Sequence, residues 1–469
     1  MKNNPDPKYK WKAMLAVSIG IFMATLDGSI VNIALPTLTR LFDTDIPTAS
    51  WVILSYLLTI TVLLLTLGRL SDMYGRKNMF AAGLLVFSFG SGLCSLSTSV
   101  GQLIAFRVVQ GFGAAMIMAT STAIVTFAFP HTERGKAMGI IGTVVSVGSM
   151  AGPALGGFLI YLIGWRSIFY LNIPIGLFAA AYALKVLEPE ELHKGQKFDI
   201  PGAFFMFISV TSLMLGITQG QGMGWNSPLI IGLFSIFAIS LMIFLYIEYK
   251  ATHPMVELSL FKNRPFSASN ASSFLSFVSM FAVIFMMPFY MEEVLGYSTS
   301  HVGMALIAIP LVMAVVAPFS GVLSDKTSSF MLSSIGMAIT CLALYLLGNL
   351  GQESTFFDIV IRLGMVGLGM GMFQSPNNSI VMGSVPKNRL GIAGSLLAIM
   401  RNLGMVTGIA ISSAVFTRGL QLNEALGISY IPAFLSGYHD AFMVAAGICA
   451  VGVVASLVRG NGDGMKERT

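Results

Sequence analysis

The stretch Gly68-Arg-Leu-Ser-Asp-Met-Tyr-Gly-Arg-Lys77 lies between two long apolar runs and holds the charged residues Arg69, Asp72, Arg76 and Lys77. Charges this dense are too costly for the hydrocarbon core of a bilayer, whereas a loop at the membrane surface accommodates them. The stretch therefore predicts a short surface loop that joins two membrane-spanning helices.

The composition of the whole chain is also typical of a membrane protein. The 469 residues are 55% hydrophobic and 10% charged, with a mean hydropathy of +0.80, whereas a soluble domain carries about a quarter charged residues. We therefore predict an all-α polytopic membrane protein. A net charge of +6 would suggest nucleic acid in a soluble chain, but in a membrane protein the location of the charges matters more, and no nucleic-acid partner is expected.

The length of the apolar runs predicts the number of spans. A hydrocarbon core about 30 Å thick needs roughly 20 apolar residues in a helix. The first apolar run is too long for a signal peptide and is interpreted as a retained span. The fourteen predicted spans lie near residues 13–37, 49–69, 79–99, 102–127, 137–161, 166–187, 201–219, 228–248, 266–290, 302–323, 330–349, 355–383, 392–416 and 437–458.

The positive charges predict the orientation of these spans. With the N-terminus in the cytoplasm, the opposite side holds only Arg40, Arg166 and Arg418. Apart from three arginines inside spans, the rest of the 27 Lys and Arg residues fall on the cytoplasmic side. Because cytoplasmic loops carry the excess of Lys and Arg, both termini are predicted to be cytoplasmic.

The two parts of the chain align with each other. Gly321-Val-Leu-Ser-Asp325 repeats the pattern of the loop at Gly68, and an offset of about 253 to 256 residues also matches further positions. These pairs are Gly111 with Gly367, Gly113 with Gly369, Pro130 with Pro386, Gly148 with Gly404 and Gly152 with Gly408. The predicted layout is a six-helix half at 1–187, a linker with two extra helices at 188–265 and a second six-helix half at 266–469. Parallel repeats with a substrate site between them are a recurrent transporter architecture.

Five motifs in order along the chain carry a family resemblance. They are Leu26-Asp-Gly-Ser-Ile-Val-Asn-Ile-Ala-Leu-Pro36, Gly68–Lys77, Arg107-Val-Val-Gln-Gly-Phe-Gly113, Gly148-Ser-Met-Ala-Gly-Pro-Ala-Leu-Gly-Gly157 and Trp165-Arg-Ser-Ile-Phe-Tyr-Leu-Asn-Ile-Pro-Ile-Gly176. Over nearly its whole length the chain resembles the 14-span drug:proton antiporters of the major facilitator superfamily, the EmrB/QacA type. The resemblance implies the major facilitator fold and export driven by a proton gradient.

Asp27 is the strongest candidate for the proton carrier. Counted from Lys12, it lies roughly 22 Å into the bilayer, and it is the only acid deep inside a predicted span. Arg107 enters from the other side and reaches nearly the same depth, so the two could pair. The resemblance implies a role for Arg107 in proton relay. The alternative is a permanent ion pair that clamps the first and fourth spans for packing.

Two further arginines, Arg362 and Arg401, lie deep within predicted spans. With Arg107 they make three deep arginines against one deep aspartate. We therefore infer a cavity that tolerates anionic, zwitterionic or neutral amphiphiles better than dications, with Asn32 of the first motif as a further possible cavity residue. The alternative is that both arginines bond helix carbonyls and never meet substrate.

The small residues Gly148, Gly152, Pro153, Gly156 and Gly157 are concentrated on one span. Spacings of four place glycines on one helix face and allow close approach of a neighbouring backbone. The proline adds a bend because it removes a helical hydrogen bond. The packing could seal a leak, as the family's antiporter motif implies, or serve packing alone.

The opening loop is interpreted as a cytoplasmic gate. Its arginines and lysine are explained by orientation alone, but Asp72 needs a local partner on a face that favours cations. The resemblance implies that this carboxylate engages Arg76 or Arg134 and the positive end of a helix. The proposed gate residues are Gly68, Asp72, Gly75, Arg76, Arg134 and Asp325.

The sequence therefore predicts a multi-pass exporter of the cytoplasmic (inner) membrane that expels amphipathic drugs or toxic compounds in exchange for protons. An exporter of one metabolite, siderophore or lipid precursor is the alternative, and a non-transporting membrane sensor is a third reading. No Walker loop or nucleophile triad occurs, so neither an enzyme nor an ATP-driven pump is expected. The cysteines Cys94, Cys341 and Cys449 have no motif spacing, so no metal and no cofactor is expected. The expected partners are small substrates, protons and membrane lipid; a monomer is expected, and an envelope-spanning partner is possible.

Overall fold

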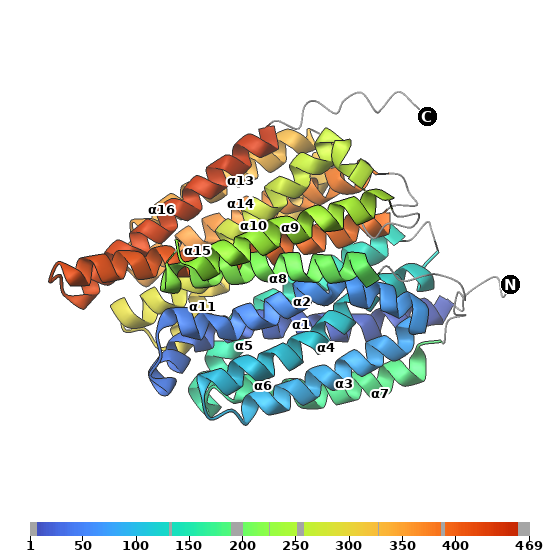
Figure 1. Cartoon of the computed structure of the whole chain (residues 1–469), viewed down its shortest axis with the longest axis horizontal. Helices are drawn as coiled ribbons and strands as arrows, with labels where there is room; N and C mark the ends of the chain where they lie inside the picture. Colours follow the sequence, from blue (N-terminus) through green and yellow to red (C-terminus); the bar gives the residue numbers. More distant parts are fainter. Residues whose placement is uncertain are drawn as a thin grey trace. The chain divides into compact units, whose positions relative to one another are not determined.

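The computed structural model describes residues 7–130, 134–188, 200–224, 226–250, 258–326, 328–385 and 390–457. Within these ranges the regular structure is helical (Figure 1). The chain divides into two compact units, one of residues 1–207 and 298–303 and the other of residues 208–297 and 304–469.

The first unit contains the helices of the first half of the chain. They are α1 (Pro7–Phe42), α2 (Ile46–Tyr74), α3 (Arg76–Ser95), α4 (Val100–Ala128), α5 (Arg134–Ile163), α6 (Ser167–Tyr170) and α7 (Asn172–Val186). In this unit α1 packs on α4, α5 and α7, and α4 packs on α2 and α3. The first helix is therefore enclosed by its neighbours.

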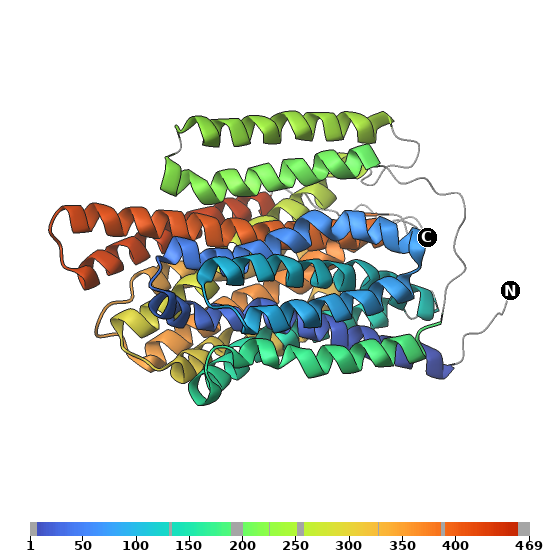
Figure 2. The same cartoon turned by 60° about the horizontal axis from the view of Figure 1, so that its bottom comes forward.

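The second unit contains the helices of the second half. They are α9 (Pro228–Lys250), η2 (Leu258–Lys262), α10 (Arg264–Phe289), η3 (Tyr290–Val294), α12 (Ala308–Lys326), α13 (Ser329–Gly348), α14 (Phe356–Gly383), α15 (Leu390–Ala425) and α16 (Tyr430–Leu457). Two helices, α8 (Ile200–Met223) and α11 (Thr299–Leu306), are divided between the units. In Figure 2 α8 and α9 form a hairpin, and Gly216 of α8 lies against the ring of Phe234.

Polar residues at helix starts fix several of these boundaries. The side chain of Asp45 accepts a hydrogen bond from Thr48 N at 3.0 Å at the start of α2. Thr355 and Asp358 form a reciprocal capping box at the start of α14. Such caps satisfy backbone N–H groups that have no partner within the helix.

Twelve helical segments among the described residues are long and apolar enough to cross a membrane. They come from α1, α2, α3, α4, α6 with α7, α9, α10 with η3, α11 with α12, α13, α14, α15 and α16. A shorter apolar helix, Pro201–Ile217, belongs to α8. These segments make the chain a multi-pass membrane protein, and the predicted count of fourteen stays a prediction.

Glycines paired by the alignment of the two halves lie at corresponding contacts between helices in the two units. A Cβ at Gly111 of α4 would lie 3.0 Å from the carbonyl oxygen of Tyr56 on α2. Gly367 of α14 lies in the same way against the carbonyl of Ile309 on α12. Because a side chain at either position would meet backbone, these contacts require glycine.

The contact between α1 and α5 also has a counterpart, between α10 and α15. A Cβ at Gly148 of α5 would lie 3.1 Å from Phe22 O on α1. A Cβ at Gly404 of α15 would lie 2.7 Å from Phe274 O on α10. The aligned positions therefore play the same packing role in each unit.

The predicted domain boundaries at residues 187/188 and 265/266 stay predictions. The compact units divide instead inside α8, between Phe207 and Ile208. The compact units group residues that contact one another, whereas the predicted linker was defined by having no counterpart in the other half. The compact units and the predicted domains therefore describe different properties.

Candidate functional site

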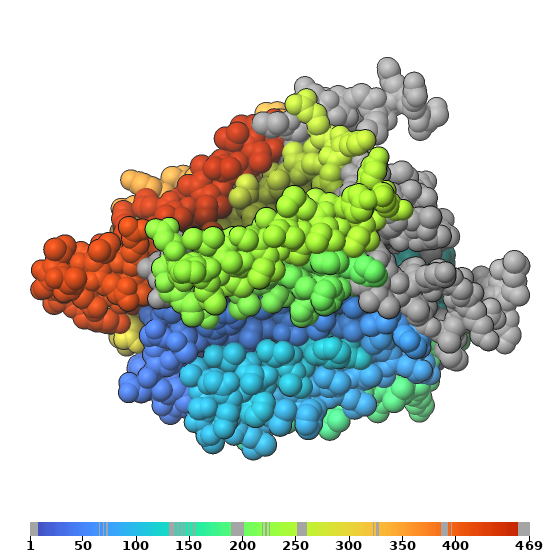
Figure 3. Space-filling model, viewed as in Figure 1, coloured from blue at the N-terminus to red at the C-terminus, as the bar shows by residue number. Residues whose placement is uncertain are grey.

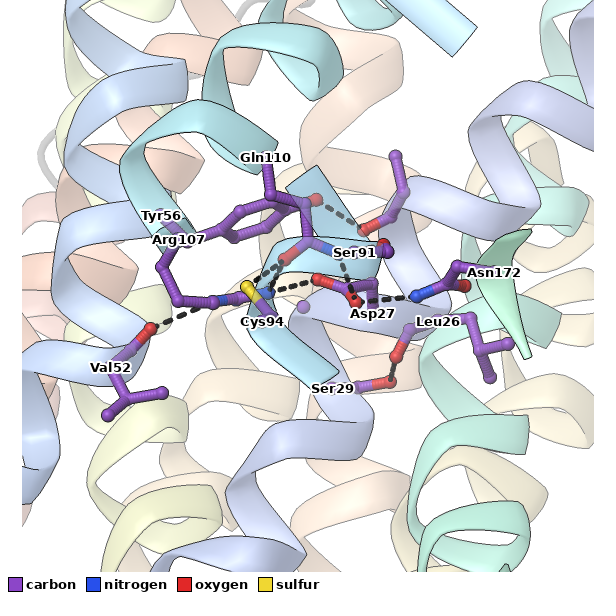
Figure 4. A network of polar contacts seen from close by, with 12 residues as sticks. Leu26, Asp27, Ser29, Val52, Tyr56, Ser91, Cys94, Arg107, Gln110 and Asn172 are labelled. Atoms are coloured by element: carbon purple, nitrogen blue, oxygen red, sulfur yellow. Dashed lines mark hydrogen bonds and ion pairs between the residues drawn. The ribbon is translucent and has the colours of Figure 1, made fainter. Parts of the chain in front are cut away.

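The centre of the candidate site is an ion pair between Asp27 of α1 and Arg107 of α4 (Figure 4). Nη1 of Arg107 donates to Oδ2 of Asp27, and neither side chain is exposed. Their depths in the predicted spans indicated that they could pair, and this prediction is confirmed. Removing either partner of a charge pair enclosed this completely would leave one uncompensated buried charge.

Two amides complete the surroundings of the Asp27 carboxylate. Gln110 Nε2 and Asn172 Nδ2 each donate to Asp27 Oδ1 at 2.8 Å. The carboxylate thus accepts from three side chains on α4 and α7, all buried. These donors stabilise its negative charge in the absence of water.

Arg107 is held by more than its carboxylate partner. Its Nε donates to the carbonyl of Val52 at 2.9 Å, and Nη1 also donates to Oε1 of Gln110 at 2.6 Å. The guanidinium carbon lies 3.9 Å from the ring centroid of Tyr56, within range of a cation–π interaction. Nη2 is buried and has no hydrogen-bond partner among the described residues, so the site retains one unused donor.

Gln110 connects the ion pair to α3. Its Nε2 also donates to Ser91 Oγ at 2.6 Å, and its Oε1 accepts from Cys94 Sγ at 3.6 Å. Gly90 makes this approach possible, because a Cβ there would lie 2.6 Å from the Cα of Gln110. The network therefore joins α1, α3, α4 and α7 around one carboxylate.

Sequence reasoning missed Gln110 and Asn172 as site residues. Both lie within quoted motifs, and Gln110 follows Arg107 by one helical turn, which places them on one helix face. That spacing was the available signal for Gln110. Asn172 begins α7 after the short helix α6, and only the fold brings it to Asp27.

Asn32 lies on α1 beyond Asp27 and is buried. Its Nδ2 donates to the backbone carbonyls of Gly28 at 3.1 Å and Ser29 at 3.2 Å, while Oδ1 has no partner among the described residues. The structure therefore does not join Asn32 to the ion-pair network. Its assignment to a substrate cavity stays a prediction.

The glycine face of α5 packs directly on α1, close to Asp27. A Cβ at Gly152 would meet Ser29 and would lie 2.9 Å from Ile30 N, and one at Gly156 would lie 2.7 Å from Cγ1 of Ile30. Ser29 Oγ also donates to Gly148 O at 3.4 Å. The close approach that the spacing predicted is therefore present.

One member of the predicted antiporter helix faces away from this contact, and another is not described. Gly157 faces another segment of the same unit, because a Cβ there would lie 2.6 Å from the carbonyl oxygen of Thr299. The side chain of Pro153 lies outside the described residues.

The predicted gate is described in part. Gly75 separates α2 from α3 with φ of +98°, a conformation that favours glycine. Gly68 has an open environment, since a Cβ there would meet only Ala119 at 4.0 Å. Arg76 begins α3. The side chains of Asp72, Arg134 and Asp325 lie outside the described residues, so their pairing stays a prediction.

The two further deep arginines differ from each other. Arg362 Nη1 donates to the carbonyl of Leu346 at 2.9 Å, which is the helix-carbonyl contact foreseen as the alternative. In Arg401, Nε is buried without a partner in the described part of the chain. The assignment of Arg401 to a substrate cavity stays a prediction.

Chemically, the Asp27 site joins one carboxylate, one guanidinium and two amides, all of them buried. No group of three or more His, Cys, Asp or Glu side chains that could hold a metal occurs within the described ranges. The arrangement differs from a hydrolytic site, because the buried carboxylate faces an arginine and amides rather than a nucleophile.

Comparison with known proteins identifies the family. Residues 17–409 match the family model described as Major Facilitator Superfamily. The chain belongs to the major facilitator superfamily. Members of this superfamily are transporters and are generally not enzymes.

Several superfamily relatives resemble this chain over most of their length. The riboflavin transporter RibZ of Clostridioides difficile (strain 630) is 36% identical over 96% of this chain and 97% of its own. The multidrug resistance protein Stp of Mycobacterium tuberculosis is 30% identical over 87% of this chain and 76% of its own. The multidrug transporter MdtP of Bacillus subtilis is 29% identical over 88% of this chain and 77% of its own.

A solved superfamily structure shares the fold. The POT family transporter PepTSo matches with a TM-score of 0.69 at 13% identity, over 97% of this chain and 99% of that chain. At this identity the likeness concerns the fold alone.

Proposed function

We propose that this protein is a proton-coupled exporter of amphipathic compounds and that Asp27 carries the coupling proton. The observation that supports the proposal is the buried ion pair of Asp27 and Arg107. Ionisable groups inside membrane spans are costly and commonly mark ion or proton pathways. Relatives named as multidrug transporters agree with this function.

Protonation of Asp27 would change the contacts between α1 and α4. The neutral acid no longer attracts the guanidinium of Arg107 by charge, although Val52 O and Gln110 Oε1 still accept from it. Arg107 already has an unused donor at Nη2. The two protonation states therefore favour different helix contacts, which supplies a means of coupling the proton to alternating access.

We assign the chain to the 14-span drug:proton antiporter branch. The twelve apolar segments leave α5, with 30 residues, and α8, with 24 residues, as the two further spans. At 1.5 Å per residue each is long enough for a core of about 30 Å. The excess of Lys and Arg on one side supports cytoplasmic termini and a place in the cytoplasmic membrane.

For the gate, we propose that Asp72 keeps the cytoplasmic side closed through Arg76 or Arg134. The fixed turn at Gly75 would hold the two ends of this loop in register. Substitution Asp72→Asn should then impair cycling while leaving substrate binding largely intact, and equal loss of binding and transport would contradict the gate.

The second candidate is a transporter of one metabolite. RibZ, named as a riboflavin transporter, is 36% identical over nearly the full length. The uncharged flavin ring also fits the inference that neutral or anionic amphiphiles are preferred over dications. Arg401, whose Nε has no partner among the described residues, supports the same preference.

Everted membrane vesicles test the coupling. An imposed pH gradient should drive uptake of a fluorescent amphiphile by the unmodified protein, and an uncoupler or Asp27→Asn should abolish this uptake. Asp43→Asn is the matched control, because Asp43 is an exposed acid at the end of α1. Gradient-driven uptake that survives Asp27→Asn would contradict the proposal.

The same vesicles distinguish the two candidates. Labelled riboflavin and a set of unrelated amphiphiles would be compared for competition. Mutual competition across the set favours a multidrug exporter, whereas transport of riboflavin that the others do not inhibit favours the single-metabolite alternative.

A further inference from the structure

A groove lies on the outside of the hairpin formed by α15 and α16. It has a volume of about 380 Å³ and lies near the exposed tip of this hairpin, which is red in Figure 3. The groove is lined by Val415, Arg418, Gly419, Leu422, Asp440, Met443 and Val444. Its floor is apolar and its charged residues are one cation and one anion.

A close crossing of the two helices positions these charges. A Cβ at Gly419 would lie 2.7 Å from the Cα of Gly437 and 3.2 Å from Oδ2 of Asp440. The Asp440 carboxylate therefore lies directly against α15, next to the residue that follows Arg418. Glycine at 419 leaves this space open.

Arg418 and Asp440 are both exposed. Neither has a hydrogen bond or an ion pair with any residue that the structure describes. The groove thus presents a guanidinium and a carboxylate, each with unused hydrogen-bonding capacity, beside apolar side chains.

The predicted span at residues 392–416 indicates the depth of the groove. At 1.5 Å per residue, Arg418 lies roughly 42 Å along α15 from Leu390. The hydrocarbon core is about 30 Å thick, and about 40–45 Å with both headgroup regions. With the predicted span at residues 392–416, Arg418 lies two residues, or roughly 3 Å, beyond the hydrocarbon core, and Val444 lies one helical turn further into α16 than Asp440.

We propose that this groove binds the headgroup of a phosphatidylethanolamine lipid. The guanidinium of Arg418 would donate to the phosphate, for which its planar fork is suited. The carboxylate of Asp440 would accept from the primary ammonium, in a charge-assisted hydrogen bond. Leu422, Met443 and Val444 would contact the glycerol and the first part of an acyl chain.

Other lipids match these two charges less well. Phosphatidylglycerol has the phosphate but no cation for Asp440, and phosphatidylcholine has a cation without an N–H donor. The charge pair therefore selects a zwitterion with a primary amine. This inference is independent of the transported substrate.

Native mass spectrometry of the full-length protein in detergent tests the proposal. Equal amounts of phosphatidylethanolamine, phosphatidylcholine and phosphatidylglycerol with the same acyl chains would be added, and the fraction of protein retaining each lipid would be measured. Phosphatidylethanolamine should be retained in preference to both others. Equal retention of the three lipids would overturn the proposal.

Variants locate the binding at the groove. Arg418→Ala and Asp440→Asn should each lower phosphatidylethanolamine retention by about two- to fivefold, as for loss of one exposed charge contact. Asp440→Asn should also remove the preference over phosphatidylcholine. Glu424→Gln, at an exposed acid of the same hairpin outside the groove, is the control and should retain the lipid as the unmodified protein does.

Two further outcomes distinguish a lipid bound at the groove from a soluble headgroup and from a lipid bound elsewhere. Soluble glycerophosphoethanolamine at the same concentration should not compete, because it lacks the acyl chains that contact the groove; full competition would overturn a lipid site. A preference for phosphatidylethanolamine that all three variants retain would place the binding elsewhere and would equally overturn the proposal.

Discussion

The carboxylate of Asp27 on α1 and the guanidinium of Arg107 on α4 form an ion pair in which neither side chain is exposed. Two amides and a backbone carbonyl from other helix positions complete the pair. Both the proposed proton coupling and the packing of the first unit depend on this relationship, so substitutions around it should separate the two roles.

Replacement of Arg107 should be costly because the partner charge would stay buried. Arg107→Leu should destabilise the protein by about 3–5 kcal/mol, the usual effect of breaking a buried pair. Arg107→Lys keeps the charge but not the planar fork that reaches Val52 O and Asp27 together. Its loss of stability should therefore be smaller than that of Arg107→Leu. Thermal unfolding in detergent would measure both, and equal destabilisation by the two variants would contradict the pairing described.

Gln110 is predicted to position and stabilise the Asp27 carboxylate rather than to carry the proton. In Gln110→Leu the Asp27 carboxylate loses one of its donors and Arg107 loses an acceptor, so transport driven by an imposed pH gradient should slow while substrate binding in detergent is largely retained. Gln110→Glu can still accept from Arg107 and forms a second matched variant. Equal loss of substrate binding and of gradient-driven transport would indicate a purely structural role.

The glycine face of α5 should tolerate no side chain. Gly152→Val would force a branched side chain against Ser29 and Ile30, and overpacking of this kind costs about 1–3 kcal/mol. Gly447→Val is the control, because nothing lies within 4 Å of a Cβ there. The unfolding temperatures of the two variants would be measured in detergent. Equal temperatures would contradict the close approach of α1 and α5.

The loop at Gly75 should be sensitive to backbone strain. Gly75→Ala places a side chain at φ of +98° and should cost about 1–3 kcal/mol. Gly68→Ala, in the same motif but with open space around it, should fold and be as stable as the unmodified protein. Chemical denaturation in detergent would measure the difference.

The free donor of Arg401 predicts a charge preference. Arg401→Gln should weaken transport of an anionic amphiphile roughly tenfold, as expected for loss of a hydrogen bond to a charged group, and should leave a neutral analogue nearly unaffected. Arg362 donates to Leu346 O. Arg362→Gln should therefore not alter the preference between the two compounds. A dication transported better than the anion by the unmodified protein would contradict the inferred cavity charge.

The sequence alone predicted the pairing of Asp27 with Arg107 because depth can be counted along a helix at a fixed rise per residue. It also predicted the glycine face of α5, since a spacing of four defines one face. Both predictions depend on position along one helix, which sequence determines directly.

The remaining contacts depend on which helices become neighbours. Asn172 reaches Asp27 only because α7 packs on α1, and an uncharged amide gives no sign in the sequence that it is buried at a site. The partner of Arg362 is a backbone carbonyl on α13, which any residue could supply. For this reason the sequence left two alternatives for Arg362 and named no partner.

Proton release by the purified protein tests the central claim most directly. In weakly buffered detergent solution, addition of a transported amphiphile should release protons, detected with a soluble pH indicator. We predict that Asp27→Asn binds the amphiphile without proton release, whereas Asp43→Asn releases protons as the unmodified protein does. Undiminished substrate-induced proton release from Asp27→Asn would contradict the account.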